Sequence, residues 1–409
     1  MRILINAYAC SPTWGSEPGM GWNWISNLAK YCDLHIITEG EWKAEIEKEL
    51  LSHPYAKKLH FYYLPVSARI RKMCWNQGDW RFYFFYNKWQ KRALELARDI
   101  VKKEKIDVIH QLNMVGFREP GYLWKIDCPF VWGPIGGMGD VPIRYLEGDS
   151  IKTKLKLRIK NVISNCQLKY SPQIDKAFRK SSVVIAAVPI VVRKVKEIKG
   201  IDTILINETG CYELSSDIVD KTKRAGLQIL WVGRFIYTKR LDIALKTISK
   251  VKSLSDITFH IVGTGSEQEV KHYKQLAKDL GIEEICIWYG KVTNKEVHEM
   301  MRNVDLFFFT SIMEATSTVV PEAINNGLPI LCFNTCGFGP LVTDRIGRRI
   351  ELTTPNDSID KFAEQIKILY QDKEILHQMS LNCKEEIKKL LWENKARLLL
   401  SIYGSLISK

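Results

Sequence analysis

Two glutamates, Glu314 and Glu322, stand in EATSTVVPEAINNGLPIL, directly after the apolar run VDLFFFT. The pattern predicts a strand, a loop and a helix that begins near Pro321, because proline suits the first turn of a helix. A helix N-terminus attracts anions through its free N–H groups and its dipole. A carboxylate there would repel a phosphate, so we expect both glutamates to accept hydrogen bonds from hydroxyl groups attached to the anion. The alternative is that Glu322 only complements the helix dipole and that Glu314 is a solvated loop residue.

Two cations, Arg234 and Lys239, follow the predicted strand LQILWVG and precede a predicted helix. Fixed cations in that place can bind a diphosphate and offset the charge that it gains as a leaving group. The alternative is an ordinary solvated basic loop. Together with the glutamates, the cations favour a nucleotide sugar as ligand, since this molecule carries ribose hydroxyls, a diphosphate and sugar hydroxyls.

The elements that must position these residues are strands and helices in alternation. Short apolar runs alternate with amphipathic segments in both halves of the 409-residue chain, from RILINAY to PFVWGPIG and again from LQILWVGRF to LPILCF. Such alternation predicts parallel βαβ units, whose ligands bind at the carboxyl ends of the strands. We therefore predict an α/β fold of two Rossmann-like, doubly wound parallel-sheet domains facing across a cleft. The predicted domains cover 1–210 and 211–385, and a C-terminal helix over 386–409 crosses back to the first.

Four motifs of the second half occur in a characteristic order. They are Gly233-Arg234 with Lys239, the Gly-x-Gly loop of Gly263 and Gly265, Lys291-Val292 after ICIWYG, and the two glutamates. In their order and spacing they resemble the donor half of the family 4 glycosyltransferases, which have the GT-B fold. The first half resembles a bacterial polysaccharide-type subgroup of that family through GSEPGMGW, HQLNMVGFREPGYLW and PFVWGPIGG. The resemblance makes 1–210 the acceptor-binding domain and 211–385 the nucleotide-sugar donor domain.

The resemblance also implies a role for each matching residue. Its catalytic residues would be Arg234 and Lys239 on the diphosphate, Glu314 on the donor sugar, and His110 as the active-site histidine. Its donor-binding residues would be Gly15, Glu17, Gly19, Gly233, Gly263, Gly265, Lys291, Val292, Ala315, Thr316, Ser317, Thr318 and Glu322, the last holding the ribose. The family usually has glycines where this chain has Ala315, Thr316 and Ser317, so we expect its sugar pocket to differ.

The implied reaction is transfer of a sugar, with retention of its anomeric configuration, from a UDP or GDP donor to a glycan or lipid-linked saccharide. An acceptor hydroxyl would attack the front face of the sugar, and an oxygen of the leaving phosphate would take its proton. The sequence contains no Asp-x-Asp motif of the kind that bridges a metal to a diphosphate. We therefore expect a metal-independent enzyme of polysaccharide or glycoconjugate assembly, with no cofactor apart from the nucleotide sugar substrate.

Other classes of function fit less well. An NAD-type oxidoreductase is suggested by Gly19, Gly21 and Glu39, but the loop from Tyr8 to Gly19 is too long and no glycine stands three residues after Gly21. A nucleic-acid-binding protein is suggested by the formal net charge of +14, but RNP, zinc-finger and basic-zipper signatures are absent. A glycosidase would need two carboxyl groups across a scissile bond, whereas both glutamates belong to one helix start.

The basic excess has a second expected origin, in two segments that combine cations with apolar residues. Segment 151–165 carries Lys152, Lys154, Lys156, Arg158 and Lys160 with an apolar stripe, and segment 69–92 carries Trp75, Trp80, Phe84, Phe85 and Trp89. Such segments suit an anionic lipid surface. The alternative is that the stripe packs on the N-terminal domain and the cations are solvated.

The expected location follows from what the sequence lacks. It opens directly on a strand, no apolar run is long enough to span a bilayer, and its ten cysteines form no CxxC pair. We therefore expect a cytoplasmic protein, held peripherally on the inner face of the cell membrane. Its expected partners are a nucleotide sugar, a saccharide or lipid-linked acceptor and that membrane surface, with no nucleic acid.

Overall fold

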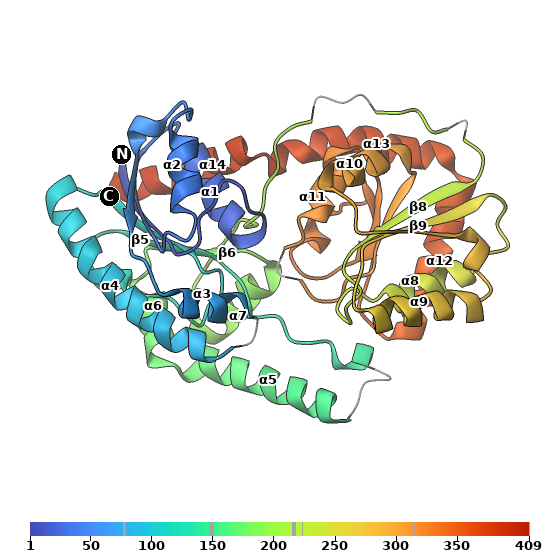
Figure 1. Ribbon diagram of the computed structural model, residues 1–409, viewed down its shortest axis with the longest axis horizontal. Coiled ribbons are helices and arrows are strands. Elements are labelled where there is room, and N and C mark those ends of the chain that lie inside the picture. The colour runs from blue at the N-terminus through green and yellow to red at the C-terminus, as the bar shows by residue number, and fades with distance from the viewer. Residues whose placement is uncertain (77–78, 147–150, 215–217, 223, 315, 409) are drawn as a thin grey trace. The chain divides into compact units, whose positions relative to one another are not determined.

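The computed structural model describes residues 1–76, 79–146, 151–214, 218–222, 224–314 and 316–408. Within these ranges the chain divides into two α/β units (Figure 1). The N-terminal unit comprises Met1–Gly139, Lys160–Gly210 and Trp392–Lys409, and the C-terminal unit comprises Asp140–Ile159 and Cys211–Leu391.

The N-terminal unit is built on a parallel sheet in which seven strands are described, in the order β3-β2-β1-β4-β5-β6-β7. The strands are β1 (Arg2–Ala7), β2 (Asp33–Thr38), β3 (Leu59–Tyr63), β4 (Val108–Asn113), β5 (Phe130–Ile135), β6 (Val183–Ala186) and β7 (Ile204–Leu205). The helices are α1 (Ser16–Leu28), α2 (Lys43–Leu50), α3 (Ala68–Trp75), α4 (Arg81–Glu104), α6 (Pro172–Lys180), α7 (Pro189–Lys199) and α14 (Trp392–Ile407), while α5 (Ile151–Tyr170) begins in the C-terminal unit and ends here. Apolar runs such as that of β1 are buried throughout, as helices on both faces of a parallel sheet require.

The C-terminal unit repeats this architecture with a sheet of six described strands, in the order β10-β9-β8-β11-β12-β13. The strands are β8 (Leu227–Val232), β9 (Ile257–Val262), β10 (Cys286–Gly290), β11 (Leu306–Phe309), β12 (Ile330–Phe333) and β13 (Gly347–Ile350). The helices are α8 (Leu241–Ser249), α9 (Glu267–Asp279), α10 (Asn294–Asn303), α11 (Val319–Asn325), α12 (Pro355–Gln371) and α13 (Lys373–Glu386). Short 3-10 helices lie at Ala56–Lys58, Leu123–Lys125, Ile143–Leu146, Glu283–Ile285, Gly339–Leu341 and Ile387–Leu390.

In both sheets the chain first adds strands on one side of the first strand, β1 or β8, and then adds the remaining strands on its other side. This is the doubly wound pattern of parallel strands. The predicted α/β class, with two doubly wound parallel sheets, is therefore confirmed. In such sheets ligands bind beyond the carboxyl ends of the strands, so the loops at those ends of each sheet are the places to look for a site.

Two helices at this edge of the C-terminal sheet begin with capping boxes. Ser266 accepts a hydrogen bond from the Glu269 N–H before α9, and Thr293 accepts one from the Glu296 N–H before α10. In both, the glutamate side chain accepts a hydrogen bond from the backbone N–H of the capping residue. The boxes satisfy backbone donors at each helix start and so fix where the preceding loops end.

Residues 140–159 depart from the predicted division at 1–210, because they group with the C-terminal unit. The anchor is Tyr145, whose ring packs edge-on against Phe333 at 5.7 Å and whose hydroxyl lies 2.7 Å from that of Ser358. At the other end of the chain, α14 packs on α1 in the N-terminal unit, where the rings of Trp24 and Trp392 are 5.5 Å apart.

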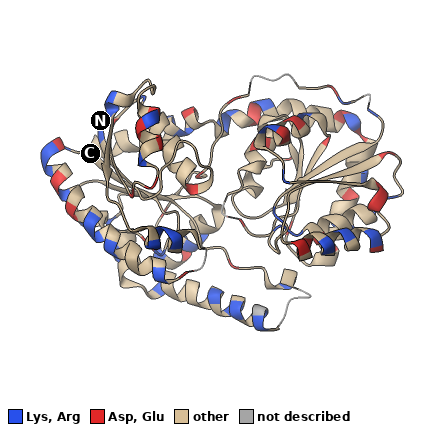
Figure 2. Cartoon of the chain, viewed as in Figure 1, with Lys and Arg blue, Asp and Glu red and all other residues tan. Residues whose placement is uncertain are grey.

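Of the two segments expected at a membrane, α5 is basic along its length, whereas segment 69–92 is partly buried. Along α5, Lys and Arg recur and no Asp or Glu occurs (Figure 2). In segment 69–92, Trp80 and Phe84 are exposed, but Trp89 is buried and belongs to the core of the N-terminal unit. The prediction that Trp89 belongs to a surface was therefore wrong, because its position on α4 faces the sheet.

Candidate functional site

Three glycines close the carboxyl edge of β8, β9 and β10. The Gly233 N–H donates to the Val262 carbonyl at 3.0 Å, and the Gly263 N–H donates to the Gly290 carbonyl at 2.8 Å. Gly263 has φ +133°, and a Cβ there would lie 1.8 Å from the Gly233 carbonyl oxygen. A side chain at residue 263 would therefore force the ends of β8 and β9 apart, so the backbone can approach this closely only with glycine at 263.

Lys239 and Glu314, which come from different βαβ units, form an ion pair at the same edge. Their Nζ and Oε1 atoms are 2.5 Å apart, and their side chains are only 14% and 18% exposed. The Ser311 hydroxyl donates a second hydrogen bond to Glu314 Oε1 at 2.7 Å, and Lys239 Nζ lies 5.0 Å from the centre of the Phe309 ring. The structure thus brings together two of the predicted catalytic residues and shields them partly from water.

Backbone and hydroxyl contacts hold this pair in register. The Thr310 hydroxyl donates to the Lys239 carbonyl at 2.8 Å. The Ser311 hydroxyl, whose one proton is shared with Glu314, also lies 3.1 Å from the Thr238 carbonyl oxygen. The Ile312 N–H also donates to the Thr238 carbonyl, at 2.9 Å. The end of β11 is therefore tied directly to the loop before α8, which carries Lys239.

Glu322 lies in α11 and faces the start of α10. Burial raises the pKa of Glu322, while the nearby His298 and a hydrogen bond with Asn294 oppose that rise. Asn294 is the first residue of α10, directly beyond the loop that holds Lys291 and Val292. The predicted ribose-binding carboxylate and the predicted base-binding loop are thus neighbours.

Helix α11 begins earlier than predicted. It starts at Val319, so Pro321 is its third residue rather than its first, and the side chain of Thr318 makes no capping hydrogen bond. Proline tolerates this position because the N–H groups of the first turn have no partner within the helix. With seven residues, α11 is also short, so its dipole is a weaker source of anion binding than the predicted helix start implied.

The segment between Glu314 and α11 contains hydroxyl side chains in partly enclosed positions. Ala315 lies outside the described residues. Ser317 is buried, and Thr318 is exposed. The Thr316 Oγ1 atom is buried and has no hydrogen-bond partner within the described part of the chain. A buried hydroxyl without a partner is costly, so it is well suited to meet a polar group of a ligand.

The remaining predicted residues of this unit differ in exposure and in what explains their position. Arg234 and Lys291 are exposed, and Val292 is partly buried against the core. Gly265 has a structural reason of its own, because a Cβ there would lie 2.6 Å from Glu269 Oε2, inside the capping box of α9. Gly265 is therefore explained by helix capping, and its place in donor binding stays a prediction.

At the carboxyl edge of the N-terminal sheet, the predicted loop residues precede or begin α1. Gly15 is exposed, whereas a Cβ at Gly19 would lie 2.1 Å from the Trp14 carbonyl oxygen. Glu17 Oε1 accepts a hydrogen bond from the Val115 N–H at 2.6 Å. Burial raises the pKa of Glu17 from 4.5 to about 7, against the effect of this hydrogen bond and with a further rise from Glu208.

His110 does not lie with these residues at an open surface. The ring is fully buried in β4, where Nε2–H donates to the Gly133 carbonyl at 2.6 Å and Nδ1 lies 2.5 Å from the Tyr403 hydroxyl. Burial lowers the pKa of His110 to about 4, so its ring is neutral near pH 7. Because both nitrogens are occupied, the geometry gives His110 a structural role and does not favour the predicted catalytic one.

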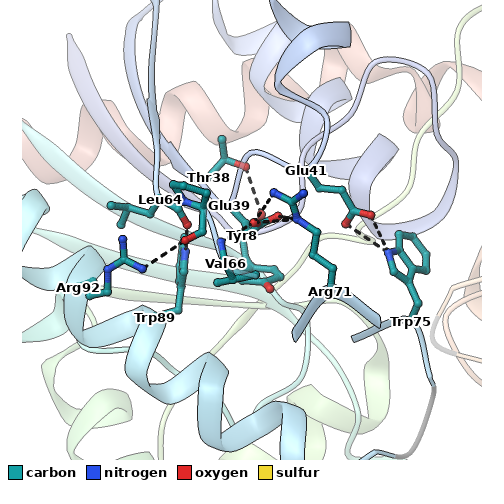
Figure 3. Close-up of polar contacts among 11 residues, drawn as sticks. Tyr8, Thr38, Glu39, Glu41, Leu64, Val66, Arg71, Trp75, Trp89 and Arg92 are labelled. Atoms are coloured by element: carbon teal, nitrogen blue, oxygen red, sulfur yellow. Dashed lines mark hydrogen bonds and ion pairs between the residues drawn. The ribbon is translucent and has the colours of Figure 1, made fainter. Parts of the chain in front are cut away.

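A cluster that the sequence did not point to lies beyond β2 and β3 (Figure 3). The Arg71 guanidinium binds both oxygens of Glu39 at 2.8 to 3.1 Å, and the Val66 N–H donates to Glu39 Oε1 at 2.8 Å. Trp75 Nε1–H donates to Glu41 Oε1 at 2.9 Å. Glu39, which suggested a dinucleotide-binding fingerprint in the sequence, therefore accepts hydrogen bonds from Arg71 and Val66. The sequence signal for this cluster was an acidic residue directly after a strand.

Compared with solved structures, the whole chain has a known fold. It matches the apo form of the lipopolysaccharide outer core galactosyltransferase WaaB with a TM-score of 0.65, at 14% identity over 99% of both chains. It matches Anabaena HepE in complex with UDP with a TM-score of 0.63, at 16% identity over 99% of this chain and 100% of that one. The two doubly wound sheets are thus those of the GT-B fold.

The sequence comparisons concern mainly one part of the chain. Residues 219–386 match the family model described as glycosyl transferases group 1. Protein CapJ of Staphylococcus aureus is 30% identical over 251 residues, which are 60% of this chain and 59% of CapJ. The lipopolysaccharide 1,6-galactosyltransferase of Salmonella typhimurium is 29% identical over 135 residues, which are 32% of this chain and 36% of that protein. The chain therefore matches less than two thirds of the length of these curated relatives.

Proposed function

We propose that the chain transfers a glycosyl group from a nucleotide sugar to a saccharide acceptor, in polysaccharide or glycoconjugate assembly. The observation that carries this proposal is the partly buried pair of Lys239 and Glu314 at the carboxyl edge of the C-terminal sheet. The match of residues 219–386 to the glycosyl transferases group 1 model supports it, because that segment contains both members of the pair. The GT-B fold agrees with it.

In this proposal the C-terminal unit binds the donor. Glu322 accepts hydrogen bonds from the ribose hydroxyls, and the loop at Lys291 and Val292 contacts the base through backbone groups. Arg234 and Lys239 offset the charge of the diphosphate. Charge-assisted hydrogen bonds of this kind are about twice as strong as neutral ones, so a few of them can fix the donor.

The proposed chemistry needs no nucleophile from the protein. The acceptor oxygen forms a bond to the anomeric carbon of the donor sugar while the bond from that carbon to the diphosphate oxygen breaks on the same face. The acceptor proton passes to the leaving phosphate oxygen, so atoms and charge balance and the configuration is retained. The contribution of Lys239 is electrostatic, because the negative charge on the diphosphate grows as the bond breaks.

Glu314 positions the transferred sugar in this scheme. Its carboxylate is held by Lys239 and Ser311 before any ligand arrives, so its orientation is set in advance. A carboxylate fixed in this way can accept hydrogen bonds from sugar hydroxyls with little loss of side-chain freedom. We also propose that transfer proceeds without a metal ion, which agrees with the absence of an Asp-x-Asp motif from the sequence.

The test begins with donor binding. The purified chain would be heated with UDP and with GDP, and UDP would be tried first because the similar HepE structure holds it. A nucleotide at about 100 times its dissociation constant stabilises its binding state by about 2.7 kcal/mol, which is a measurable rise in melting temperature. Nucleotide release from UDP-sugars and GDP-sugars would then be measured with a mixture of saccharide acceptors.

Three variants separate the site from general charge effects. We expect Lys239→Gln to lower turnover about 100- to 1000-fold, as loss of a transition-state donor does. We expect Glu322→Gln to weaken donor binding about 10-fold or more, as loss of a hydrogen bond to a charged group does. The matched control for Lys239→Gln is Lys246→Gln, at an exposed position of α8, which also removes one positive charge. Near-normal turnover and donor affinity in the first two variants would refute the proposed site.

A further inference from the structure

Helix α5 presents an apolar stripe to solvent along most of its length. Its members are between 49% and 84% exposed, and they are Ile151, Leu155, Ile159, Val162 and Ile163. Spacings of three and four residues place them on one side of a helix. Single exposed aliphatic side chains are ordinary on a protein surface, but a continuous row of them marks an interaction site.

Cations flank this stripe on both sides. At about 100° per residue, Lys152, Lys156 and Lys160 lie along one border of the stripe, and Lys154 and Arg158 lie along the other. Helix α5 contains no Asp or Glu (Figure 2). None of these five cations forms an ion pair within the described ranges of the chain. The surface of α5 is therefore both apolar and strongly positive.

The opposite side of the helix is fixed to the N-terminal unit. Arg118 donates to the hydroxyl of Ser164 at 2.6 Å and to the side chain of Gln167 at 2.8 Å, and Leu168 is buried. Lys194 donates to Asn165 at 2.9 Å. The second half of α5 is thus anchored through one face, which leaves the apolar stripe on the face turned away from these contacts.

We propose that α5 lies on an anionic lipid surface, with its apolar stripe in the interface and its flanking cations at the headgroups. Charge favours a membrane over a protein partner, because the cations along both borders, which form no ion pair with any described residue, suit a surface of many negative charges. None of the described helices is both long and apolar enough to cross a bilayer, so contact through α5 would be a surface contact. The proposal does not depend on the chemistry at the carboxyl edges of the sheets.

The experiment is sedimentation of the full chain with vesicles. We would compare vesicles of phosphatidylcholine alone with vesicles containing about 30% phosphatidylglycerol, at low salt and at about 0.5 M salt, where surface charges are screened. We expect binding to the anionic vesicles at low salt, and at least about 10-fold weaker binding to neutral vesicles and at high salt.

Two variants and one matched control locate the contact. We expect Leu155→Ser with Ile159→Ser, and separately Lys156→Gln with Arg158→Gln, to weaken binding about 10-fold each. The control is Lys271→Gln with Lys274→Gln, on the exposed side of α9, which removes two charges and should change binding less than about 2-fold. Circular dichroism and melting temperature would show that each variant is folded.

Several outcomes would overturn the proposal. They are no binding to anionic vesicles at low salt, or equal binding by the α5 variants and the wild type. Another is that Leu155→Ser with Ile159→Ser abolishes self-association in size-exclusion chromatography and leaves vesicle binding unchanged. In that case α5 would be an interface between copies of the chain. Turnover with a soluble acceptor should be unaffected by the α5 variants, so failure here would leave the proposed function standing.

Discussion

Glu17 offers a quantitative test of the electrostatics at the carboxyl edge of the N-terminal sheet. Burial raises the pKa of this carboxyl from 4.5 to about 7, although it accepts a hydrogen bond from the Val115 N–H. Between these two values the folded chain holds a proton that the unfolded chain has released. The free energy of unfolding therefore falls as pH rises through this window, and the loss is complete above it.

The size of the effect follows from the two pKa values. Their difference, at about 1.4 kcal/mol for each pH unit, amounts to about 3 kcal/mol of lost stability above about pH 8. Glu17→Gln keeps the shape of the protonated acid and its acceptor oxygen but cannot ionise. We expect this variant to be up to about 3 kcal/mol more stable than the wild type near pH 8 and nearly equal to it near pH 4.

The assay is thermal unfolding of both proteins at several pH values, followed by tryptophan fluorescence. For a unit of this size, about 3 kcal/mol corresponds to a rise of roughly 6 to 12 °C in the melting temperature of the N-terminal unit. Glu119, whose pKa burial also raises to about 7, adds to the pH dependence of both proteins and cancels in their difference. Glu95→Gln, at an exposed position of α4, is the control. A Glu17→Gln variant with no gain in stability near pH 8, or with the same gain at both ends of the pH range, would contradict a raised pKa of Glu17.

Three further predictions concern Gly263, His110 and the expected independence of metal ions. Gly263→Ala should destabilise the C-terminal unit by more than about 3 kcal/mol, because its Cβ would lie 1.8 Å from the Gly233 carbonyl oxygen; an unchanged denaturation midpoint would contradict this close approach. His110→Ala should lower the melting temperature, since it removes the partners of Gly133 and Tyr403, and should leave the dissociation constant for UDP unchanged; weaker UDP binding without loss of stability would return His110 to the site. Turnover should be unchanged after treatment with EDTA and passage through a desalting column, and activity that only an added divalent cation restores would refute metal independence.

The sequence was sufficient for the layered fold, because the fold depends on local patterns. Runs such as LFFF in β11 are too apolar for an exposed strand, and amphipathic segments of helical length separate them. This alternation leaves few topologies other than parallel βαβ units, since crossover connections of this kind are almost always right-handed. The same patterns also placed Arg234, Lys239 and Glu314 at strand ends.

The ion pair between Lys239 and Glu314 could not be predicted from the sequence. Nothing local to Lys239 or Glu314 indicates that the two meet, because their contact depends on β8 and β11 being neighbours in the sheet. The burial of His110 could not be predicted for a related reason. A histidine at a strand end resembles an active-site group in the sequence, but α14, from the far end of the chain, supplies the Tyr403 hydroxyl that encloses it. Burial by a distant segment is a tertiary property that no local pattern records.

The two carboxyl edges hold their acids in different electrostatic conditions. In the C-terminal unit, Lys239 compensates the partly buried Glu314, so this pair is stabilised before a ligand binds. In the N-terminal unit, no cation among the described residues pairs with Glu17 to offset its burial, and Glu208 raises its pKa further. A ligand with hydroxyl groups that donated to Glu17 would stabilise its ionised form, so binding there would release a proton. Under the proposed function, the carboxyl edge of the C-terminal sheet holds its acid, Glu314, in a stable ion pair before the donor binds. At the carboxyl edge of the N-terminal sheet, ionised Glu17 is unfavourable, and a hydrogen bond from a saccharide hydroxyl would make it less so.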